Sequence, residues 1–357
     1  MSLQDGLKKL ELELPQAKCR NRCKFCSNYG GQTVDEPLTR EETFRIVDDL
    51  ADIGGELLVF SGGEPLECPF VYELIEHAKK KHLQVYLYTS GYKLGEKNVR
   101  KLRSAGVDRL YVTIHGAETT HDLVADLNGS YRASVSGVER AAKEGICVGI
   151  NFIPMKVNWK EWRRVFETTT RLGVREFRFI EFMPQGRGWD NRSILELSSE
   201  EYHELLLELS RDLPRIVQST SIEVSTAGVN FGFLIDDDLF PLPTCSAGKS
   251  GLTITPEGYI IPCLGCRTKP GSKKPDPKYI LARYTLQPGN FLRQVWLTST
   301  VLKMFKELTA KALEGDCKHC TELTRCKGGC PIRREIQTGD LKTGPDYRCI
   351  IGLLRRS

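Results

Sequence analysis

Three cysteines near the N-terminus are spaced so that they could hold a metal cluster. Cys19, Cys23 and Cys26 form a Cys-x3-Cys-x2-Cys triplet. Three thiolates in one loop can ligate three irons of a [4Fe–4S] cube and leave the fourth iron open to a small molecule. The alternative is structural zinc, which needs four closed ligands, and no fourth cysteine or histidine lies near the triplet. The triplet therefore predicts an iron–sulfur cluster with one open coordination site.

The last third of the chain contains eight of the 13 cysteines. An odd cysteine count in a chain without an export signal argues against disulfides and favours metal ligation. Zinc ribbons are the alternative, because Cys-x2-Cys pairs often bind zinc. Two further cysteines fit no motif and are expected to be buried apolar residues. The C-terminal cysteines are Cys245, Cys263, Cys266, Cys317, Cys320, Cys326, Cys330 and Cys349, and the two without a motif are Cys68 and Cys147.

The composition excludes several classes of protein. The 51 basic and 46 acidic residues of this 357-residue chain give a net charge of only +5, too small an imbalance to indicate a nucleic-acid partner. No run reaches the roughly 18 to 20 apolar residues of a membrane span. The N-terminus also lacks the apolar core of a signal peptide. We therefore expect a cytoplasmic protein without a membrane or nucleic-acid partner.

Short apolar runs alternate with amphipathic stretches through the first two-thirds of the chain. Thr39–Ile53 is typical of the helices, because Thr39 and Glu42 form a capping box. A second capped helix is expected over Ser198–Arg211. The runs that predict strands are Leu10–Leu14, Leu57–Phe60, Val85–Tyr88, Leu110–Ile114, Ile146–Ile153 and Phe177–Ile180.

Alternation of strands and helices predicts a parallel sheet of the α/β class. The pattern leaves open whether six units form a doubly wound sheet or an incomplete barrel. Beyond about Phe240 the chain becomes rich in Pro, Gly, Cys and Lys, so we expect one domain over 1–239 and another over 240–357. The Pro- and Lys-rich segment Arg267–Lys278 is expected to be an exposed loop.

The cysteine triplet follows the first predicted strand, and Ser61-Gly62-Gly63-Glu64-Pro65 follows the second. With aromatic Phe25 before the last cysteine of the triplet, this pair of motifs resembles the radical S-adenosylmethionine (SAM) superfamily. The resemblance implies a partial (β/α)6 barrel. It also implies a [4Fe–4S] cluster whose open iron binds the amino and carboxylate groups of SAM, and a 5′-deoxyadenosyl radical that abstracts hydrogen.

The same resemblance assigns contacts to SAM at the strand ends. The Gly-Gly-Glu-Pro loop would receive the methionyl ammonium, where glycines admit a ligand closely and Glu64 offers a carboxylate. His115 stands where relatives often have Asp. The alternative for each polar residue is an ordinary helix cap at a strand end. The implied contacts are Gly62, Gly63, Glu64, Pro65, Ser90, Thr113 and Asn151, with the backbone of Phe25 and Met183 at the adenine.

The C-terminal cysteines resemble the SPASM domain of radical SAM maturases. That resemblance implies two auxiliary [4Fe–4S] clusters with crossed ligation, a feature also known in two-cluster ferredoxins. No cysteine lies a few residues after Cys245, so Cys266 is a candidate fourth ligand. The alternative is an open iron that binds a substrate thiol or amine. The first cluster would take Cys245, Cys263 and Cys330, and the second Cys317, Cys320, Cys326 and Cys349.

The leading functional hypothesis is a maturase-like radical SAM/SPASM oxidoreductase. It would abstract hydrogen from a peptide or protein side chain while the auxiliary clusters take up the second electron. The alternative is the same chemistry on a small molecule, such as a tetrapyrrole, a metal-pterin cofactor or a sugar. Ferredoxin or flavodoxin would supply electrons. A non-enzymatic iron–sulfur carrier ranks last, because it leaves the Gly-Gly-Glu-Pro loop without a purpose.

Two relatives within the superfamily can be tested against particular residues, and neither fits. Phe177–Met183 resembles a strand of the molybdopterin-precursor cyclase, but Gly149 stands where that enzyme needs a basic residue. Anaerobic sulfatase maturases need an Asp where this chain has Leu264. No catalytic acid or base is assigned: Glu181 and Asp236–Asp238 are candidates only as carboxylates, and Arg187 is a candidate contact for an anionic substrate.

Overall fold

One sheet runs through the described part of the chain. The computed structural model describes residues 6–32, 34–227, 245–267, 275–349 and 351. Its strand order is β10-β9-β8-β1-β2-β3-β4-β5-β6-β7. The strands are β1 (Lys9–Glu13), β2 (Leu57–Ser61), β3 (Gln84–Thr89), β4 (Arg109–Thr113), β5 (Val148–Phe152), β6 (Glu176–Ile180), β7 (Glu223–Ala227), β8 (Gly251–Ile254), β9 (Tyr259–Ile261) and β10 (Ala282–Arg283).

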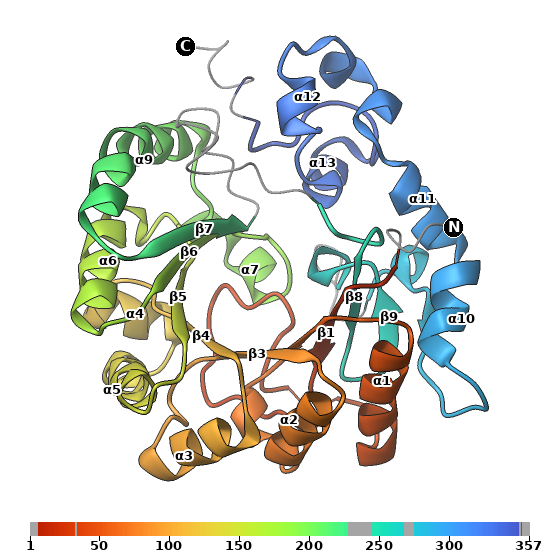
Figure 1. The fold of residues 1–357 in the computed structure, drawn as a ribbon. Coiled ribbons are helices and arrows are strands. Elements are labelled where there is room, and N and C mark those ends of the chain that lie inside the picture. The colour runs from red at the N-terminus through yellow and green to blue at the C-terminus, as the bar shows by residue number, and fades with distance from the viewer. Residues whose placement is uncertain (1–5, 33, 228–244, 268–274, 350, 352–357) are drawn as a thin grey trace.

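The strands form an open arc with helices on its outer side (Figure 1). Strands β1 to β7 pair in parallel in chain order, and β8 pairs in parallel with the other edge of β1. All six predicted strands are present with ends within two residues, which confirms the partial-barrel α/β fold. Strand β7 was missed because its sequence Glu-Val-Ser-Thr-Ala carries little of the apolar signal.

The helices of the first two-thirds connect successive strands. The capping boxes of Thr39 with Glu42 and of Ser198 with Glu201 are both observed. These helices are α1 (Arg40–Asp52), α2 (Val71–Lys80), α3 (Glu96–Ala105), α4 (Glu118–Ala125), α5 (Ser130–Lys143), α6 (Trp162–Arg171), α7 (Arg187–Asp190), α8 (Arg192–Leu195) and α9 (Ser199–Ser219). Those of the C-terminal part are α10 (Phe291–Thr298), α11 (Thr300–Glu307), α12 (Leu323–Cys326) and α13 (Pro331–Thr338).

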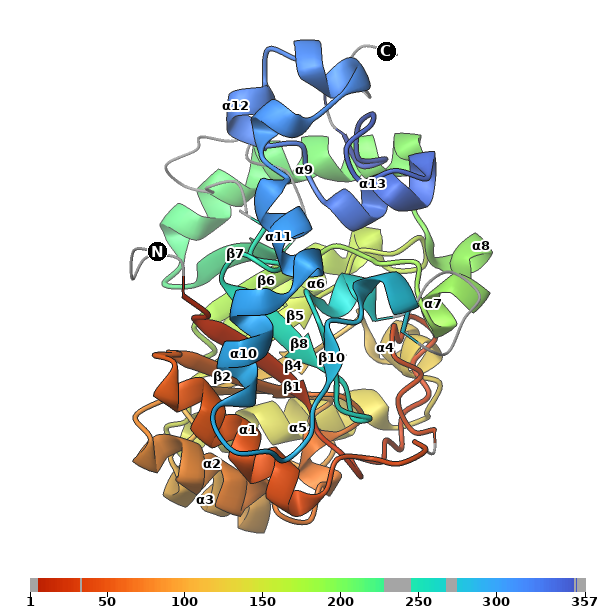
Figure 2. The same cartoon turned by 90° about the vertical axis from the view of Figure 1, so that its right-hand side faces the viewer.

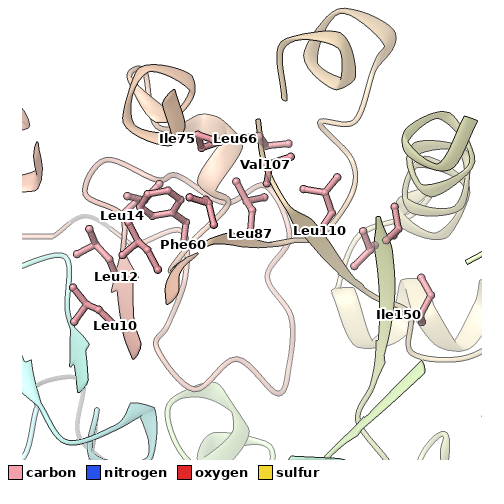
Figure 3. Close-up of a cluster of buried hydrophobic side chains, with 14 of the residues drawn as sticks. Leu10, Leu12, Leu14, Phe60, Leu66, Ile75, Leu87, Val107, Leu110 and Ile150 are labelled. Carbon is pink, nitrogen blue, oxygen red and sulfur yellow. The ribbon is translucent and has the colours of Figure 1, made fainter. Parts of the chain in front are cut away.

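The two faces of the sheet have different chemistry. On β1, Leu10 and Leu12 point toward the helices and pack in a fully buried apolar layer with residues such as Phe60 and Leu87 (Figure 3). Each such side chain contributes about 1.5–3 kcal/mol by burial. Glu11 and Glu13 alternate with these leucines and therefore face the inside of the arc. A one-residue slip of β1 would place both carboxylates in the apolar layer, so the register is strongly specified.

The C-terminal part is joined to the barrel by polar contacts as well as by β8. Asp49 of α1 is fully buried and accepts hydrogen bonds from the Tyr284 hydroxyl at 2.9 Å and the backbone N–H of Phe291 at 3.0 Å. Figure 2 shows α10 beside α1, with α11 to α13 extending beyond it. The expected domain boundary at 239/240 lies outside the described residues and stays a prediction.

The expectation of exposure for Arg267–Lys278 is wrong at its first residue. Arg267 is only 3% exposed and pairs with Glu13 and Glu257. Composition indicated a solvated loop, but the two carboxylates compensate the buried guanidinium. Pro275 is buried as well, whereas Lys278 is exposed as expected, and residues 268–274 lie outside the described part.

None of the helices in the described ranges is long and apolar enough to cross a membrane.

We expect Thr39→Ala to lower the free energy of unfolding by about 1 kcal/mol, because it removes the N-cap of α1. Urea unfolding followed by circular dichroism measures the change. Thr119→Ala, at an exposed position in the first turn of α4, is the matched control and should leave stability unchanged or slightly raised. Equal losses in both variants would contradict the capping role.

Candidate functional site

The cysteine triplet lies in the segment between β1 and α1, inside the arc of strands (Figure 1). Cys19, Cys23 and Cys26 are each half-buried. The backbone N–H of Cys26 donates to the Cys23 carbonyl at 3.2 Å, and that of Gly30 donates to Cys26 Sγ at 3.2 Å. The segment therefore folds back on itself around the three thiols.

The surroundings of Cys19 and Cys23 disfavour the charged thiolate form unless a cation is present. Burial raises the pKa of Cys19 to about 12, and it raises the pKa of Cys23 further. A metal ligand must be a thiolate, and a cationic centre reverses this shift. Three clustered, half-buried thiols of which two disfavour the free thiolate fit an iron–sulfur cluster.

Arg187 is used within this segment. Its Nε donates to the Cys23 carbonyl at 2.9 Å and its Nη2 to the Gly30 carbonyl at 3.1 Å. The structure thus shows Arg187 clamping the cysteine segment to the start of α7, rather than projecting toward a substrate as was considered from the sequence.

The Gly62–Pro65 loop packs directly against the cysteine segment. A Cβ on Gly63 would lie 1.7 Å from the Ala17 carbonyl oxygen, so only glycine fits there. The next residue, Glu64, donates its backbone N–H to the Lys18 carbonyl at 2.9 Å. The two motifs recognised in the sequence are therefore in backbone contact.

The Glu64 side chain joins this loop to the end of β3. It is fully buried and accepts from the Thr89 hydroxyl at 2.6 Å, from the Ser90 backbone N–H at 2.9 Å and from the Ser90 hydroxyl at 2.5 Å. Burial raises the pKa of Glu64, while the donors of Ser90 and Thr89 oppose that rise. Glu64 thus holds the loop in place through its carboxylate, and the backbone of Gly62 and Gly63 is the part of the loop that lies beside the cysteines.

The remaining strand-end residues line the same end of the sheet. Thr113 of β4 and Asn151 of β5 are direct neighbours in the register. Asn151 is 3% exposed, yet its Oδ1 has no hydrogen-bond partner among the described residues, and neither has Nδ1 of buried His115. Buried polar atoms are normally satisfied. Two orphaned ones beside the cysteine segment fit a polar ligand at this end of the strands.

Apolar and aromatic groups close this end of the site. The Phe25 ring packs edge-on against His115, with 4.6 Å between ring centroids. Burial lowers the pKa of His115 well below its usual range, so the ring is neutral at pH 7. Phe25 also packs against an apolar cluster that contains Phe182, and Met183, which follows Phe182, packs against an apolar cluster of the C-terminal part.

The floor of the arc is a layer of paired polar and aromatic side chains. Glu176 accepts from Arg109 and from the Tyr111 hydroxyl, and Arg178 stacks over the Tyr111 ring at 4.5 Å. Gly149 lies under this ring: a Cβ there would be 2.6 Å from Tyr111 Cε1. The glycine that replaces a basic residue of the cyclase is thus required by the neighbouring tyrosine.

Four C-terminal cysteines come together near the mouth of the barrel. Cys263 Sγ lies 3.9 Å from Cys266 Sγ. Cys245, Cys266 and Cys330 are each close enough to Cys263 for their charges to interact. Cys266, left open by the sequence, is fully buried within this group.

The other four cysteines form a second group further out. Cys317 interacts electrostatically with Cys320 and Cys349, and Cys326 interacts with Cys317 and Cys349. The two groups contain the same members as the crossed assignment, with Cys266 added to the first. Among the described residues, no three His, Cys, Asp or Glu side chains converge tightly enough to hold a single metal ion.

The remaining candidates lie outside these groups. Cys68 is buried in the apolar core as expected, whereas Cys147 is only half-buried. Glu181 accepts a hydrogen bond from Tyr202 at 3.0 Å and pairs with Arg348 at 3.3 Å in a buried contact to the C-terminal part. Asp236–Asp238 lie outside the described residues.

Sequence reasoning missed two residues: Glu13, which contacts the cysteine segment from β1, and Asn28, which lies within that segment. Asn28 Nδ2 donates to Glu13 Oε1 at 2.6 Å, and Asn28 Oδ1 lies 2.8 Å from Cys26 Sγ. The signal that could have identified Glu13 was its position as a carboxylate on the inner face of the buried strand that precedes the triplet.

Gly63→Ala should prevent the cysteine segment from holding its cluster, because the added Cβ collides with backbone that cannot rotate away. We expect about four fewer irons per chain after anaerobic reconstitution than in the unaltered protein, measured by colorimetric iron analysis. Gly95→Ala, where a Cβ meets nothing within 4 Å, is the control and should retain all of the iron. An unchanged iron content in Gly63→Ala would contradict this account of the loop.

The comparisons with known proteins agree with this geometry. Residues 14–169 match the family model described as the radical SAM superfamily. An AdoMet-dependent heme synthase of Methanosarcina barkeri is 26% identical over 94% of each chain. A PqqA peptide cyclase of Gluconobacter oxydans is 23% identical over 90% of this chain and 85% of its own.

Similarity in fold extends to the cysteine-rich C-terminal part. SuiB of Streptococcus suis, in a crystal structure bound to S-adenosylmethionine, superimposes with a TM-score of 0.75 at 15% identity, over 97% of this chain and 78% of SuiB. The C-terminal part thus has the fold expected from the SPASM resemblance. Residues 14–169 are therefore a radical SAM domain, and this domain makes the protein an enzyme that uses a [4Fe–4S] cluster and S-adenosylmethionine.

Proposed function

We propose that this chain is a radical SAM oxidoreductase with two auxiliary clusters, and that it takes hydrogen from a carbon–hydrogen bond of a small molecule, a tetrapyrrole side chain being the first candidate. The observation that carries the substrate is the similarity to an AdoMet-dependent heme synthase along nearly the full length of both chains. The reaction class is supported by the contact between the cysteine segment and the Gly62–Pro65 loop.

Each part of the barrel mouth has a role in this proposal. Cys19, Cys23 and Cys26 hold the catalytic cluster. The backbone of the Gly62–Pro65 loop receives the ammonium of SAM, and Glu64 fixes that loop through Thr89 and Ser90. Ser90, Thr113 and Asn151 offer polar groups to the rest of the methionyl and ribose portions, and the backbone of Phe25 and Met183 flanks the adenine.

When bound, the reduced cluster and SAM supply the radical chemistry, and the auxiliary clusters offer a place for the electron left on the substrate. The chain's own contribution is positioning and the exclusion of water. The neutral His115 ring and Phe25 close one side with apolar surface. The paired layer of Arg109, Glu176 and Tyr111 closes the floor of the arc.

The auxiliary ligands follow from the two groups of thiols. We assign Cys245, Cys263, Cys266 and Cys330 to the first auxiliary cluster. Cys317, Cys320, Cys326 and Cys349 form the second. Cys266 is assigned as the fourth ligand of the first cluster because it is buried beside Cys263 and Cys330.

A peptide or protein side chain is the second candidate substrate. It is favoured by the similarity to a PqqA peptide cyclase, and SuiB has been crystallised bound to a precursor peptide, SuiA. In either case a ferredoxin or flavodoxin would supply electrons in the cytoplasm.

Anaerobically reconstituted protein with SAM and dithionite should release 5′-deoxyadenosine, measured by liquid chromatography. The variant with Cys19, Cys23 and Cys26 all changed to Ala should release none, because it cannot hold the catalytic cluster. If an iron porphyrin with propionate side chains is the substrate, adding it should raise the release of 5′-deoxyadenosine several-fold. The mass of the porphyrin should also change, because the porphyrin is oxidised.

The control porphyrin has its propionates esterified. A PqqA-type peptide tests the second candidate in parallel. Stimulation by the peptide alone would exclude the tetrapyrrole, and no SAM cleavage by protein that carries all its iron would refute the enzymatic proposal itself.

Cys266→Ala should remove about four irons per chain if Cys266 completes the first auxiliary cluster, from a total of about twelve. Cys68→Ala is the matched control, because Cys68 is equally buried but belongs to neither thiol group. Full iron in Cys266→Ala, equal to that of Cys68→Ala, would support the open-iron alternative. Iron analysis and electron paramagnetic resonance (EPR) of the reduced protein distinguish the two results.

A further inference from the structure

The catalytic cysteine segment and the first auxiliary segment are joined by a chain of hydrogen-bonded side chains. It begins at Cys26, passes through Asn28 and Glu13, and ends at Arg267. Arg267 directly follows Cys266 in the sequence. Residues 254 positions apart are thereby placed in direct contact.

Glu13 is the centre of this chain. It is the last residue of β1 and has no exposed surface. One carboxylate oxygen accepts from Asn28 Nδ2 at 2.6 Å, and the other accepts from Arg267 Nε at 2.8 Å. Each oxygen thus faces a different cluster-binding segment, and a buried carboxylate so engaged has little freedom to move.

The two ends of the chain are held just as closely. On the catalytic side, the Gly30 backbone N–H donates to both Cys26 Sγ and Asn28 Oδ1, each at 3.2 Å, which fixes the amide beside the thiol. On the auxiliary side, Arg267 Nη2 pairs with Glu257 at 3.2 Å, and the Arg267 backbone N–H donates to the Leu264 carbonyl at 2.9 Å. The guanidinium is therefore oriented by the turn that carries Cys263 and Cys266.

A second connection runs between the same two segments. Gln185 donates from its side-chain amide to the Gly265 carbonyl, between Cys263 and Cys266, and Arg187 donates to the Cys23 carbonyl. The pairing of β1 with β8 also holds the regions together. Loss of the Glu13 contact should therefore change the relative placement of the two segments without separating them.

We propose that Glu13 is a positioning residue that sets the placement of the catalytic cluster relative to the first auxiliary cluster. It does so by holding Asn28 beside Cys26 and Arg267 beside Cys266. The proposal rests on the ligand assignment made above, and it concerns residues that are not themselves assigned as ligands.

Glu13→Gln tests this directly. The amide keeps the shape of the side chain but has only one acceptor oxygen, so it meets one of its two donors with an N–H group. Arg267→Lys tests the other end, because it keeps the charge and loses the oriented fork. Asp49→Asn is the matched control. Asp49 is an equally buried carboxylate that also joins the barrel to the C-terminal part, but it is more distant in sequence from the assigned ligands than Glu13 is.

The measurement is EPR of the reconstituted, dithionite-reduced protein, with and without SAM, beside iron analysis and thermal unfolding. We expect Glu13→Gln and Arg267→Lys to keep the iron content of the unaltered protein. Both should change the magnetic coupling between the catalytic and auxiliary clusters, and the spectrum of each. Asp49→Asn should lower the unfolding temperature and leave the spectra unchanged.

The outcomes separate the inference from the proposed function. Spectra of Glu13→Gln identical to those of the unaltered protein would overturn the positioning role alone. Equal spectral changes in Asp49→Asn would also overturn it, because the effect would then be a general loss of stability. Unaltered protein without any auxiliary-cluster signal would overturn the ligand assignment and the inference together.

Discussion

The structure depends on the parallel pairing of β1 with two partners. On one edge it pairs with β2, whose end leads into the Gly62–Pro65 loop, and on the other it pairs with β8 of the C-terminal part. The cysteine segment leaves from the end of β1 itself. This segment, the Gly62–Pro65 loop and the turn that carries Cys263 and Cys266 are therefore attached to neighbouring strands, and their placement follows from one register.

Buried carboxylates make the connections that the sheet alone cannot make. Glu64 joins the loop after β2 to the end of β3, Glu13 joins β1 to the auxiliary segment, and Asp49 joins α1 to α10. Burying a charge costs free energy unless donors replace its hydration. Each of these three groups has such donors, so their contribution is to define one arrangement of distant segments.

What the sequence predicted was local. The six strands and the two capping boxes depend on patterns within a few residues of each other, and all are observed. The grouping of the C-terminal thiols came from resemblance in spacing. The pairing of β8 with β1 carries no local signal, because β8 is short and wholly buried.

The exposure of Arg267 was misjudged for the same reason. A basic residue beside a Pro- and Lys-rich run is ordinarily solvated, and only the folded structure shows that Arg267 forms ion pairs with two carboxylates. Glu13 was overlooked because one of its partners, Arg267, lies 254 positions further along the chain. Contacts of this range are determined by tertiary structure and not by periodicity.

The glycine beneath the tyrosine ring also bears on how members of this superfamily could diverge. Because any side chain at Gly149 would overlap the ring of Tyr111, a basic residue cannot be gained at that position while the tyrosine remains. Tyr111 in turn is hydrogen-bonded to Glu176 and stacked under Arg178. Acquiring a phosphate-binding cation on β5 would thus require coordinated replacement of several barrel residues. An evolutionary path by single substitutions would pass through intermediates with a disrupted barrel floor.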